Sequence, residues 1–253
     1  MRTGGGRGRE SEGYGASVGI DAGSTAAKLV RFDGRRILEA RVVEARRLCE
    51  LETLVKENDL VCSTGYFRRR VRHSLTLTEL SAARLGVARY YKNVDVIIDI
   101  GGQDTKVLDL RTNSLQMNDK CSAGTGAFLE QAARYLGVSV EGLASLASRS
   151  RRRVDINSTC SVFALSEMIS ALESGAGRAE VAAGLHRALA RRIAELVPEA
   201  RRVVAIGGVA LNTQMVRALS LELGTRVLVP PEPQLVNAIG AAAHALRASR
   251  TSL

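Results

Sequence analysis

The stretch that decides the fold is Ile97–Lys106, which reads Ile-Ile-Asp-Ile-Gly-Gly-Gln-Asp-Thr-Lys. The apolar run Val94–Ile100 predicts a buried strand, and the glycines after it predict a tight turn over Gly101–Thr105. The chain then continues in a second strand at Lys106–Leu110 and a third at Asn113–Met117. A strand, a short polar turn and a strand make a β-hairpin, so this stretch predicts an antiparallel meander.

The same pattern occurs once more, near the N-terminus. Ala16–Ile20 is apolar, Asp21–Thr25 is a polar turn with the sequence Asp-Ala-Gly-Ser-Thr, and strand-like runs follow at Ala27–Phe32 and Ile37–Val43. Each meander thus has an Asp-x-Gly sequence where its first strand ends, at Asp21 and at Asp99. This internal repeat predicts two related units in one chain.

The remaining segments complete an α/β pattern. Further strands are expected at Asp59–Ser63, Arg202–Ile206 and just before Val229, and helices at 46–57, Thr78–Tyr90, 125–136, 139–148, 162–173, 178–197, 212–223 and 235–248. We predict two related α/β subdomains with a nucleotide cleft between them. Subdomain I would comprise residues 16–93 plus 235–253, subdomain II residues 94–234, and residues 1–15 a disordered tail.

The two turns have the composition of phosphate-binding loops. Gly23, Gly101 and Gly102 let backbone N–H groups approach a phosphate closely. Hydroxyl donors and one cation complete the expected set: Ser24, Thr25, Thr105 and Lys28. One such turn would only be a hairpin, but two in matching positions, followed by Gly207-Gly208 after a later strand, favour a nucleotide site. The G-x-x-x-x-G-K-[ST] signature is absent, which excludes a Walker-type ATPase.

Four polar side chains in these turns are candidates for catalysis. Asp21 and Asp99, each at a strand end, suit a hydrated Mg²⁺ ion, which prefers carboxylate and water oxygens. Gln103 and Asp104 are placed to orient an attacking water, with Asp21 assisting. Positioning is most of what phosphoryl transfer requires, so these residue types favour ATP hydrolysis.

Composition limits the partners and the compartment. The 253 residues carry a net charge of +10, which is typical of a solvated arginine-rich surface and is also compatible with an acidic partner, either nucleic acid or protein. Only 4% of the residues are aromatic and no nucleic-acid motif is present, so we expect no nucleic acid. No apolar run reaches membrane-spanning length and the N-terminus lacks the apolar core of a secretory signal. We therefore expect a cytoplasmic protein without membrane contact.

The four cysteines fall into two pairs. Cys49 and Cys62 are expected to be small packing residues, without an assigned role. Cys121 and Cys160 each precede a predicted helix, whose N-terminal N–H groups and positive dipole end stabilise thiolates and would point at a bound cluster. Their separation of 39 positions excludes a C-x-x-C metal knuckle. Four thiolates hold a cubane, so a two-fold dimer with two thiols per chain would supply the set; two ordinary thiols remain the alternative.

The architecture resembles the actin, Hsp70 and sugar-kinase superfamily, with its ribonuclease H-like fold. In that superfamily two phosphate hairpins and a Gly-Gly segment enclose ATP between two lobes. The resemblance implies adenosine contacts from Gly207, Gly208, Ala210 and Asn212, and a hinge helix at Gln234–Ala242.

Three segments resemble the ATP-dependent activators of 2-hydroxyacyl-CoA dehydratases and the related benzoyl-CoA reductase ATPases of BadF/BadG type. They are Ile97–Lys106, Asn118–Gly126 around Cys121, and Ser158–Ala164 around Cys160. The resemblance implies a homodimer with one bridging [4Fe–4S] cluster on Cys121 and Cys160 of both chains. It also implies that ATP binding and its hydrolysis to ADP reorient the cluster helices. The protein would then dock on an acyl-CoA dehydratase or reductase and deliver one low-potential electron. A ferredoxin or flavodoxin would suit the basic surface as electron donor.

Two other functions stay open on this evidence. A small-molecule kinase, such as a sugar kinase, would need a general base facing a substrate hydroxyl, and Asp104 could serve. An ATP-gated iron–sulfur scaffold or redox sensor would bind nucleotide and cluster but deliver no electron.

Overall fold

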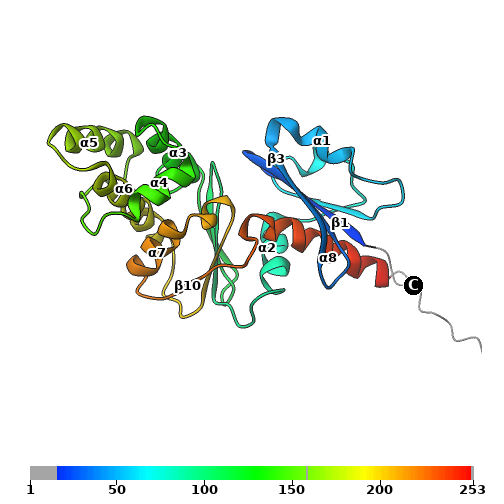
Figure 1. The fold of residues 1–253 in the computed structure, drawn as a ribbon. Coiled ribbons are helices and arrows are strands. Elements are labelled where there is room, and N and C mark those ends of the chain that lie inside the picture. Colours follow the sequence, from blue (N-terminus) through cyan, green and yellow to red (C-terminus); the bar gives the residue numbers. More distant parts are fainter. Residues whose placement is uncertain (1–15, 158, 252–253) are drawn as a thin grey trace, which may run out of the picture.

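The computed structural model describes residues 16–157 and 159–251, so the predicted tail at 1–15 lies outside the described residues. Two five-stranded sheets form the framework (Figure 1). The first holds β1 (Ser17–Ala22), β2 (Ala26–Phe32), β3 (Ile37–Glu44), β4 (Val61–Thr64) and β5 (Leu75–Thr76). The second holds β6 (Val96–Ile100), β7 (Thr105–Asp109), β8 (Ser114–Asn118), β9 (Val203–Ile206) and β10 (Val227–Leu228).

The two sheets have the same topology, which confirms the internal repeat. Their strand orders are β3-β2-β1-β4-β5 and β8-β7-β6-β9-β10. In each, the opening strand pairs antiparallel with the next strand and parallel with a later one. The register places Asp21 opposite Lys28 in the first sheet and Asp99 opposite Lys106 in the second. These four residues are therefore equivalent pairs.

The helices agree with the predicted ones except at one place. They are α1 (Leu48–Glu52), α2 (Glu79–Val87), α3 (Gly126–Tyr135), α4 (Val140–Ala147), α5 (Ser161–Glu173), α6 (Arg178–Ala194), α7 (Thr213–Glu222) and α8 (Val236–Thr251), with short 3₁₀ turns η1 (Ala45–Arg47), η2 (Arg68–Arg70), η3 (Gly208–Leu211) and η4 (Pro233–Leu235). The expected helix over 46–57 is too long: its first half is helical, as η1 and α1, but helical structure ends at Glu52. Beyond it, the Asp59 carboxylate accepts the Lys56 N–H, which stabilises a turn instead of a helix.

Helices α2 and α8 lie between the two sheets (Figure 1). Helix α8 packs on β1 and β4 of the first sheet, as expected of a last helix that returns to the first subdomain. Glycines permit its close approach: a Cβ on Gly19 would lie 1.9 Å from the Ala238 carbonyl oxygen, and one on Gly240 would lie 1.9 Å from that of Ala82 in α2. Helix α2 packs on the second sheet through Ala83. The two helices thus join the sheets.

Helices α3–α7 cover the other face of the second sheet and form the largest core (Figure 1). Among its fully buried side chains are Leu129, Met168 and Leu185, from α3, α5 and α6. This helical layer carries both predicted cysteine segments. None of the helices in residues 16–157 and 159–251 is both long and apolar enough to span a membrane.

Candidate functional site

The two predicted phosphate turns, Asp21–Thr25 and Gly101–Thr105, meet between the sheets. A Cβ on Gly102 would lie 2.3 Å from the Thr25 hydroxyl oxygen, so the turns are in direct contact. A Cβ on Gly23 would lie 2.8 Å from the Ala26 carbonyl oxygen, and the N–H of Gly101 donates to the Asp104 carbonyl, which closes the second turn. The structure therefore brings together two glycine turns that are far apart in the sequence.

Asp21 is buried at the end of β1 and forms an ion pair with Lys28, whose Nζ lies 3.1 Å from its carboxylate. Burial alone would lower the pKa of Lys28, but the charge of Asp21 raises it above its usual value. Thr64 stands opposite Asp21 across β1 and β4, and its buried hydroxyl lacks a hydrogen-bond partner among the described residues. Lys28 therefore faces Asp21, beside an unsatisfied polar atom.

Asp99 occupies the equivalent position in the second sheet but has a different partner. The Asn237 side-chain amide, from α8, donates to its carboxylate at 2.9 Å. Burial raises the pKa of Asp99 to about 6 in spite of that bond. The carbonyl oxygen of the same Asn237 amide is buried without a hydrogen-bond partner among the described residues. Asn237 was not among the predicted site residues. The signal that could have found it is that Asn237 is the single polar side chain in the apolar stretch Val236–Ala243.

These groups fit a hydrated Mg²⁺ ion. The carboxylates of Asp21 and Asp99, at two strand ends, can ligate the ion. The unpaired oxygens of Thr64 and Asn237 can accept hydrogen bonds from the waters that Mg²⁺ retains. Within the described residues no three His, Cys, Asp or Glu side chains gather as a metal cage. A magnesium ion held largely through water and phosphate oxygens requires no such cage, so Asp21 and Asp99 stay the predicted ligands.

The two predicted water-positioning residues differ in their surroundings. Gln103 is exposed at the tip of the second turn. The Asp104 carboxylate lies 2.5 Å from the Nζ of Lys106, which also lies 2.8 Å from a carboxylate oxygen of Glu79 in α2. Burial works against the charge of Lys106, but these two acids raise its pKa above the usual value. Asp104 is thus held in an ion-pair network that sequence reasoning did not reveal, since Glu79 is distant in the chain.

The segment after β9 was expected to contact adenosine. Gly207 has a φ of 90° and packs against Asp99, where a Cβ would lie 2.7 Å from the carboxylate. A Cβ on Gly208 would meet no atom within 4 Å, so its surroundings are open, whereas Ala210 is buried. The Asn212 side chain caps α7 and bonds the Nε2 atom of buried His186 at 2.9 Å. That side chain is therefore engaged within the protein, and its contact with nucleotide stays a prediction.

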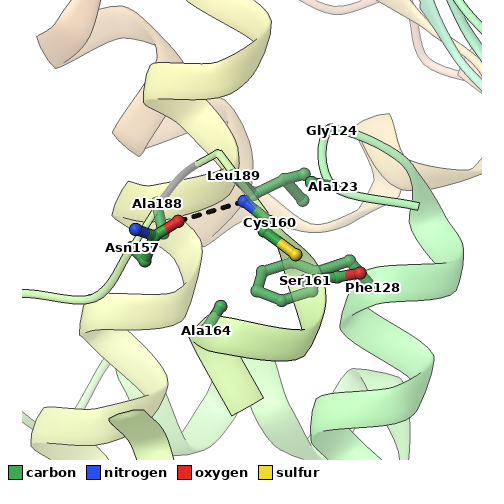
Figure 2. A pocket seen from close by; sticks show the side chains of 9 residues that line it. All are labelled: Ala123, Gly124, Phe128, Asn157, Cys160, Ser161, Ala164, Ala188 and Leu189. Atoms are coloured by element: carbon green, nitrogen blue, oxygen red, sulfur yellow. Dashed lines mark hydrogen bonds between the residues drawn. The ribbon is translucent and has the colours of Figure 1, made fainter. Parts of the chain in front are cut away.

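Cys160 is the N-cap residue of α5, as the sequence predicted, and its N–H donates to the Asn157 side chain at 3.0 Å (Figure 2). It lines a narrow pocket between α5, α6 and the loop before α3. Cys121 lies in that loop, and both cysteines are partly exposed. The hydroxyls of Ser122 and Ser161, the residues that follow them, are 2.7 Å apart. The two cysteine segments therefore lie side by side.

Cys121 precedes a helix as predicted, because α3 begins at Gly126, but the start of that helix is already engaged. The N-cap of α3 is Thr125, and the first two helical N–H groups, of Gly126 and Ala127, donate to the carbonyls of Gly101 and Gly102. These N–H groups hold the second turn and are not available to a cluster at Cys121. Thr105 is also engaged: its buried hydroxyl donates to the Gly124 carbonyl at 2.6 Å, so its contact with phosphate stays a prediction.

The other two cysteines have no such setting. Cys62 is buried in β4, and burial raises the pKa of its thiol to about 11. The sequence predicted a packing role for Cys49 as well, but its thiol is exposed on α1. The packing prediction is therefore confirmed for Cys62, whose buried thiol is unreactive, and is wrong for Cys49.

Comparison with known proteins agrees with this geometry. The model of the BadF/BadG/BcrA/BcrD ATPase family matches residues 56–245. The 2-hydroxyisocaproyl-CoA dehydratase activator of Clostridioides difficile is 38% identical over 93% of this chain and 97% of its own length. The (R)-2-hydroxyglutaryl-CoA dehydratase activating ATPase of Acidaminococcus fermentans is also 38% identical, over 91% of this chain and 97% of its own.

Solved structures show the same relationship. The Clostridium difficile activator with bound ADPNP superposes with a TM-score of 0.86, covering 94% of this chain and 96% of that chain. The Acidaminococcus fermentans component A superposes with a TM-score of 0.87, covering 94% and 100%. A sucrose-bound ROK family protein from Streptococcus pneumoniae, at 9% identity and a TM-score of 0.53, shares the fold alone. The predicted actin-like ATPase fold is thereby confirmed.

Proposed function

This chain belongs to the BadF/BadG/BcrA/BcrD ATPase family, and from that premise we propose that it is an ATP-hydrolysing iron–sulfur activase. It would deliver a low-potential electron to a 2-hydroxyacyl-CoA dehydratase or a benzoyl-CoA reductase-like partner. The observation that carries the proposal is the Ser122–Ser161 contact, which brings the segments of Cys121 and Cys160 together on the surface of the same subdomain that supplies the second phosphate turn.

The nucleotide would bind where the two turns meet. Backbone N–H groups of both turns would cradle its phosphates, and Asp21 and Asp99 would hold Mg²⁺ through water. Exposed Gln103 is free to orient the attacking water. Asp104 would steady that turn through Lys106. Because Asp104 is paired with a cation, it is a poor general base, which disfavours the sugar-kinase alternative.

The cysteines would hold a [4Fe–4S] cluster shared by two chains, which serves as a one-electron carrier when bound. One chain offers two neighbouring, partly exposed thiols, and a cubane takes four thiolates, so a homodimer supplies the set. The N-terminus of α5 favours the anionic state of Cys160. Exposed Val162 and Phe163, immediately after Cys160, would be covered at the dimer interface.

The electron would come from a reduced ferredoxin or flavodoxin and pass to the acyl-CoA enzyme. These donors are acidic as a class, and the net charge of +10 on this chain favours their association. Association of this kind weakens as salt screens the charges. We expect electron transfer from the donor to slow markedly between about 0.01 M and 0.15 M ionic strength. A rate that did not change would contradict an electrostatic encounter with the donor.

The proposal is tested by anaerobic reconstitution with iron and sulfide, followed by iron analysis. We expect about four irons per dimer in the wild type and loss of iron in both Cys121→Ala and Cys160→Ala. Cys49→Ala is the matched control, since that exposed thiol lies in the other subdomain, and it should retain the iron. A folded, nucleotide-binding protein without iron would rule out the activase.

A cluster alone does not separate an activase from a redox sensor. The iron-loaded dimer should therefore be reduced with ferredoxin or flavodoxin and mixed with a 2-hydroxyacyl-CoA dehydratase and MgATP. We expect dehydratase turnover that requires ATP hydrolysis. Nucleotide and cluster binding without turnover of any dehydratase or reductase tested would favour the sensor.

A further inference from the structure

The second phosphate turn is bonded directly to the loop that carries Cys121. This cysteine loop, residues Asn118–Thr125, runs from β8 to α3. The Thr105 hydroxyl of the turn donates to the Gly124 carbonyl, and the N–H groups of Gly126 and Ala127 donate back to carbonyls of the turn. Gly124 has a φ of 94°, and a Cβ there would lie 2.7 Å from the Asn118 amide. A shift of the turn must therefore shift the cysteine loop.

The loop itself is tightly held. The Asn118 side chain donates to the Ala123 carbonyl, and both the N–H and the hydroxyl of Thr125 donate to the Ser122 carbonyl. These hydrogen bonds leave Ser122 in a defined position relative to the turn. Its hydroxyl lies 2.7 Å from the Ser161 hydroxyl at the first residue of α5.

Helix α5 also belongs to the hydrophobic core, which it enters through Ala164 and Met168. Its buried residues are Ser161, Ala164 and Met168, and it packs mainly on α6. The Asn157 N–H donates to the Glu167 carboxylate, which holds the preceding segment to α5 itself. Among the described residues, the Ser122–Ser161 hydrogen bond is the one side-chain hydrogen bond that joins the two cysteine segments.

We infer that Ser122 and Ser161 are positioning residues that make the arrangement of Cys121 and Cys160 depend on the nucleotide held at the second turn. This inference rests on the proposed function and names the contact that would couple its two halves. The phosphate moves the turn, the turn moves the cysteine loop, and the serine pair carries that displacement to α5. Among the described residues, the hydrogen bonds of the first turn run instead to Ala45 and Phe67, which are far from either cysteine segment in the chain.

Coupling between two sites is measured as the factor by which one ligand changes the behaviour of the other. In the iron-loaded dimer, the readout is the initial rate at which a ferrous chelator removes iron, with no nucleotide, with MgADP and with MgADPNP. In the iron-free full chain, the readout is the alkylation rate of each cysteine by iodoacetamide under the same conditions. We expect nucleotide to change both rates roughly fivefold or more in the wild type.

In Ser161→Ala and in Ser122→Ala, the ratio of each rate with nucleotide to the rate without it should fall below about twofold. The nucleotide Kd should change little. The double variant should have the same ratio as either single variant. Ser161→Thr keeps the hydroxyl and should restore the ratio. Ser166→Ala, which removes a hydroxyl that bonds only within α5, is the control and should leave it unchanged. A purely structural role would instead alter both rates by the same factor in every nucleotide state.

The outcomes separate this inference from the proposed function. A wild-type ratio of one, or a wild-type ratio retained in Ser161→Ala, overturns the inference even if iron is bound. An iron-free protein whose alkylation depends on nucleotide and on Ser161 supports the inference and overturns the activase.

Discussion

The pairs Asp21–Lys28 and Asp99–Lys106 occupy equivalent positions in two sheets of the same topology, yet they differ in bonding. Lys28 forms an ion pair with the aspartate opposite it. Lys106 bonds Asp104 and Glu79 instead, and Asp99 receives its hydrogen bond from Asn237. As a result Asp99 is half-buried without a paired cation, and its pKa is raised to about 6. A repeated backbone therefore does not imply repeated chemistry.

The difference arises from the helices α2 and α8, which lie between the sheets. Glu79 is in the first turn of α2 and Asn237 in the first turn of α8, and both contact the second sheet. Equivalent strand positions differ for the same reason. Gly19 of β1 lets α8 approach the backbone, whereas Ile97 of β6, at the matching position before Asp99, packs on α2. The second turn is thus held by helices on both faces of its sheet.

The largest expected effect concerns that close approach. Gly19→Ala would place a Cβ 1.9 Å from a carbonyl oxygen of α8, and backbone on both sides cannot give way. We expect a loss of more than about 4 kcal/mol in the free energy of unfolding, measured by urea denaturation. Gly208→Ala, with open space around its Cβ, is the control. Equal midpoints for the two variants would show that the α8 contact is not tight.

Gly19 should not tolerate a larger side chain, whereas Ile97, at the matching position in the second sheet, should not tolerate a smaller one. Ile97 is fully buried between β6 and α2, so Ile97→Ala leaves a cavity. We expect a loss of about 3 to 4 kcal/mol by the same measurement. Ile97→Val should cost about 1 kcal/mol. If Ile97→Gly were better tolerated than Ile97→Val, the two sheets would be packed alike and the comparison would fail.

The two lysines should differ in the same experiment. Lys28→Met leaves the carboxylate of Asp21 buried without its cation, and we expect a loss of about 2 to 3 kcal/mol. Lys106→Met leaves Asp104 and Glu79, which are each more exposed to water, so about 1 kcal/mol is expected. An equal loss in both variants would mean that the two pairs are energetically equivalent.

The smallest effect, and the one that depends on pH, concerns Asp99. Because its pKa is higher in the folded protein than its usual 3.8, the folded state binds the proton more tightly, and wild-type stability rises as pH falls through about 6. Asp99→Asn removes the charge. At pH 7 we expect it to be more stable than the wild type by about 1 to 2 kcal/mol, discounted for partial exposure, and the gain should shrink toward pH 4.

The same substitution tests the site. Asp99→Asn should slow MgATP hydrolysis by roughly a hundredfold, since the substitution removes one of the two carboxylates that we propose hold the ion. If the Asp99 carboxylate is kept for activity at a cost in stability, this variant should be more stable than the wild type but inactive. A gain in stability that did not change between pH 7 and pH 4 would contradict the raised pKa.

Most of the fold could be predicted from the sequence because its signals are local. Apolar runs ended by Gly-rich turns predicted both meanders, and Thr78 predicted the start of α2, where its hydroxyl accepts the Ser81 N–H. The helix expected over 46–57, which ends at Glu52, shows the limit of such signals. There a single carboxylate, Asp59, competes for backbone N–H groups, and periodicity does not report that competition.

The sequence by itself determined which residues could serve: the Asp-x-Gly turns, the Gly-Gly segment and the two cysteines in their short motifs. Their types and spacing are local properties, so they can be recognised in the chain. Only the tertiary structure decided which partners surround each of them. Asn237, Glu79 and Ser161 lie 138, 27 and 39 positions from the partners they bond, Asp99, Lys106 and Ser122. Such contacts depend on how helices cross sheets, and that geometry is set by packing of the whole core.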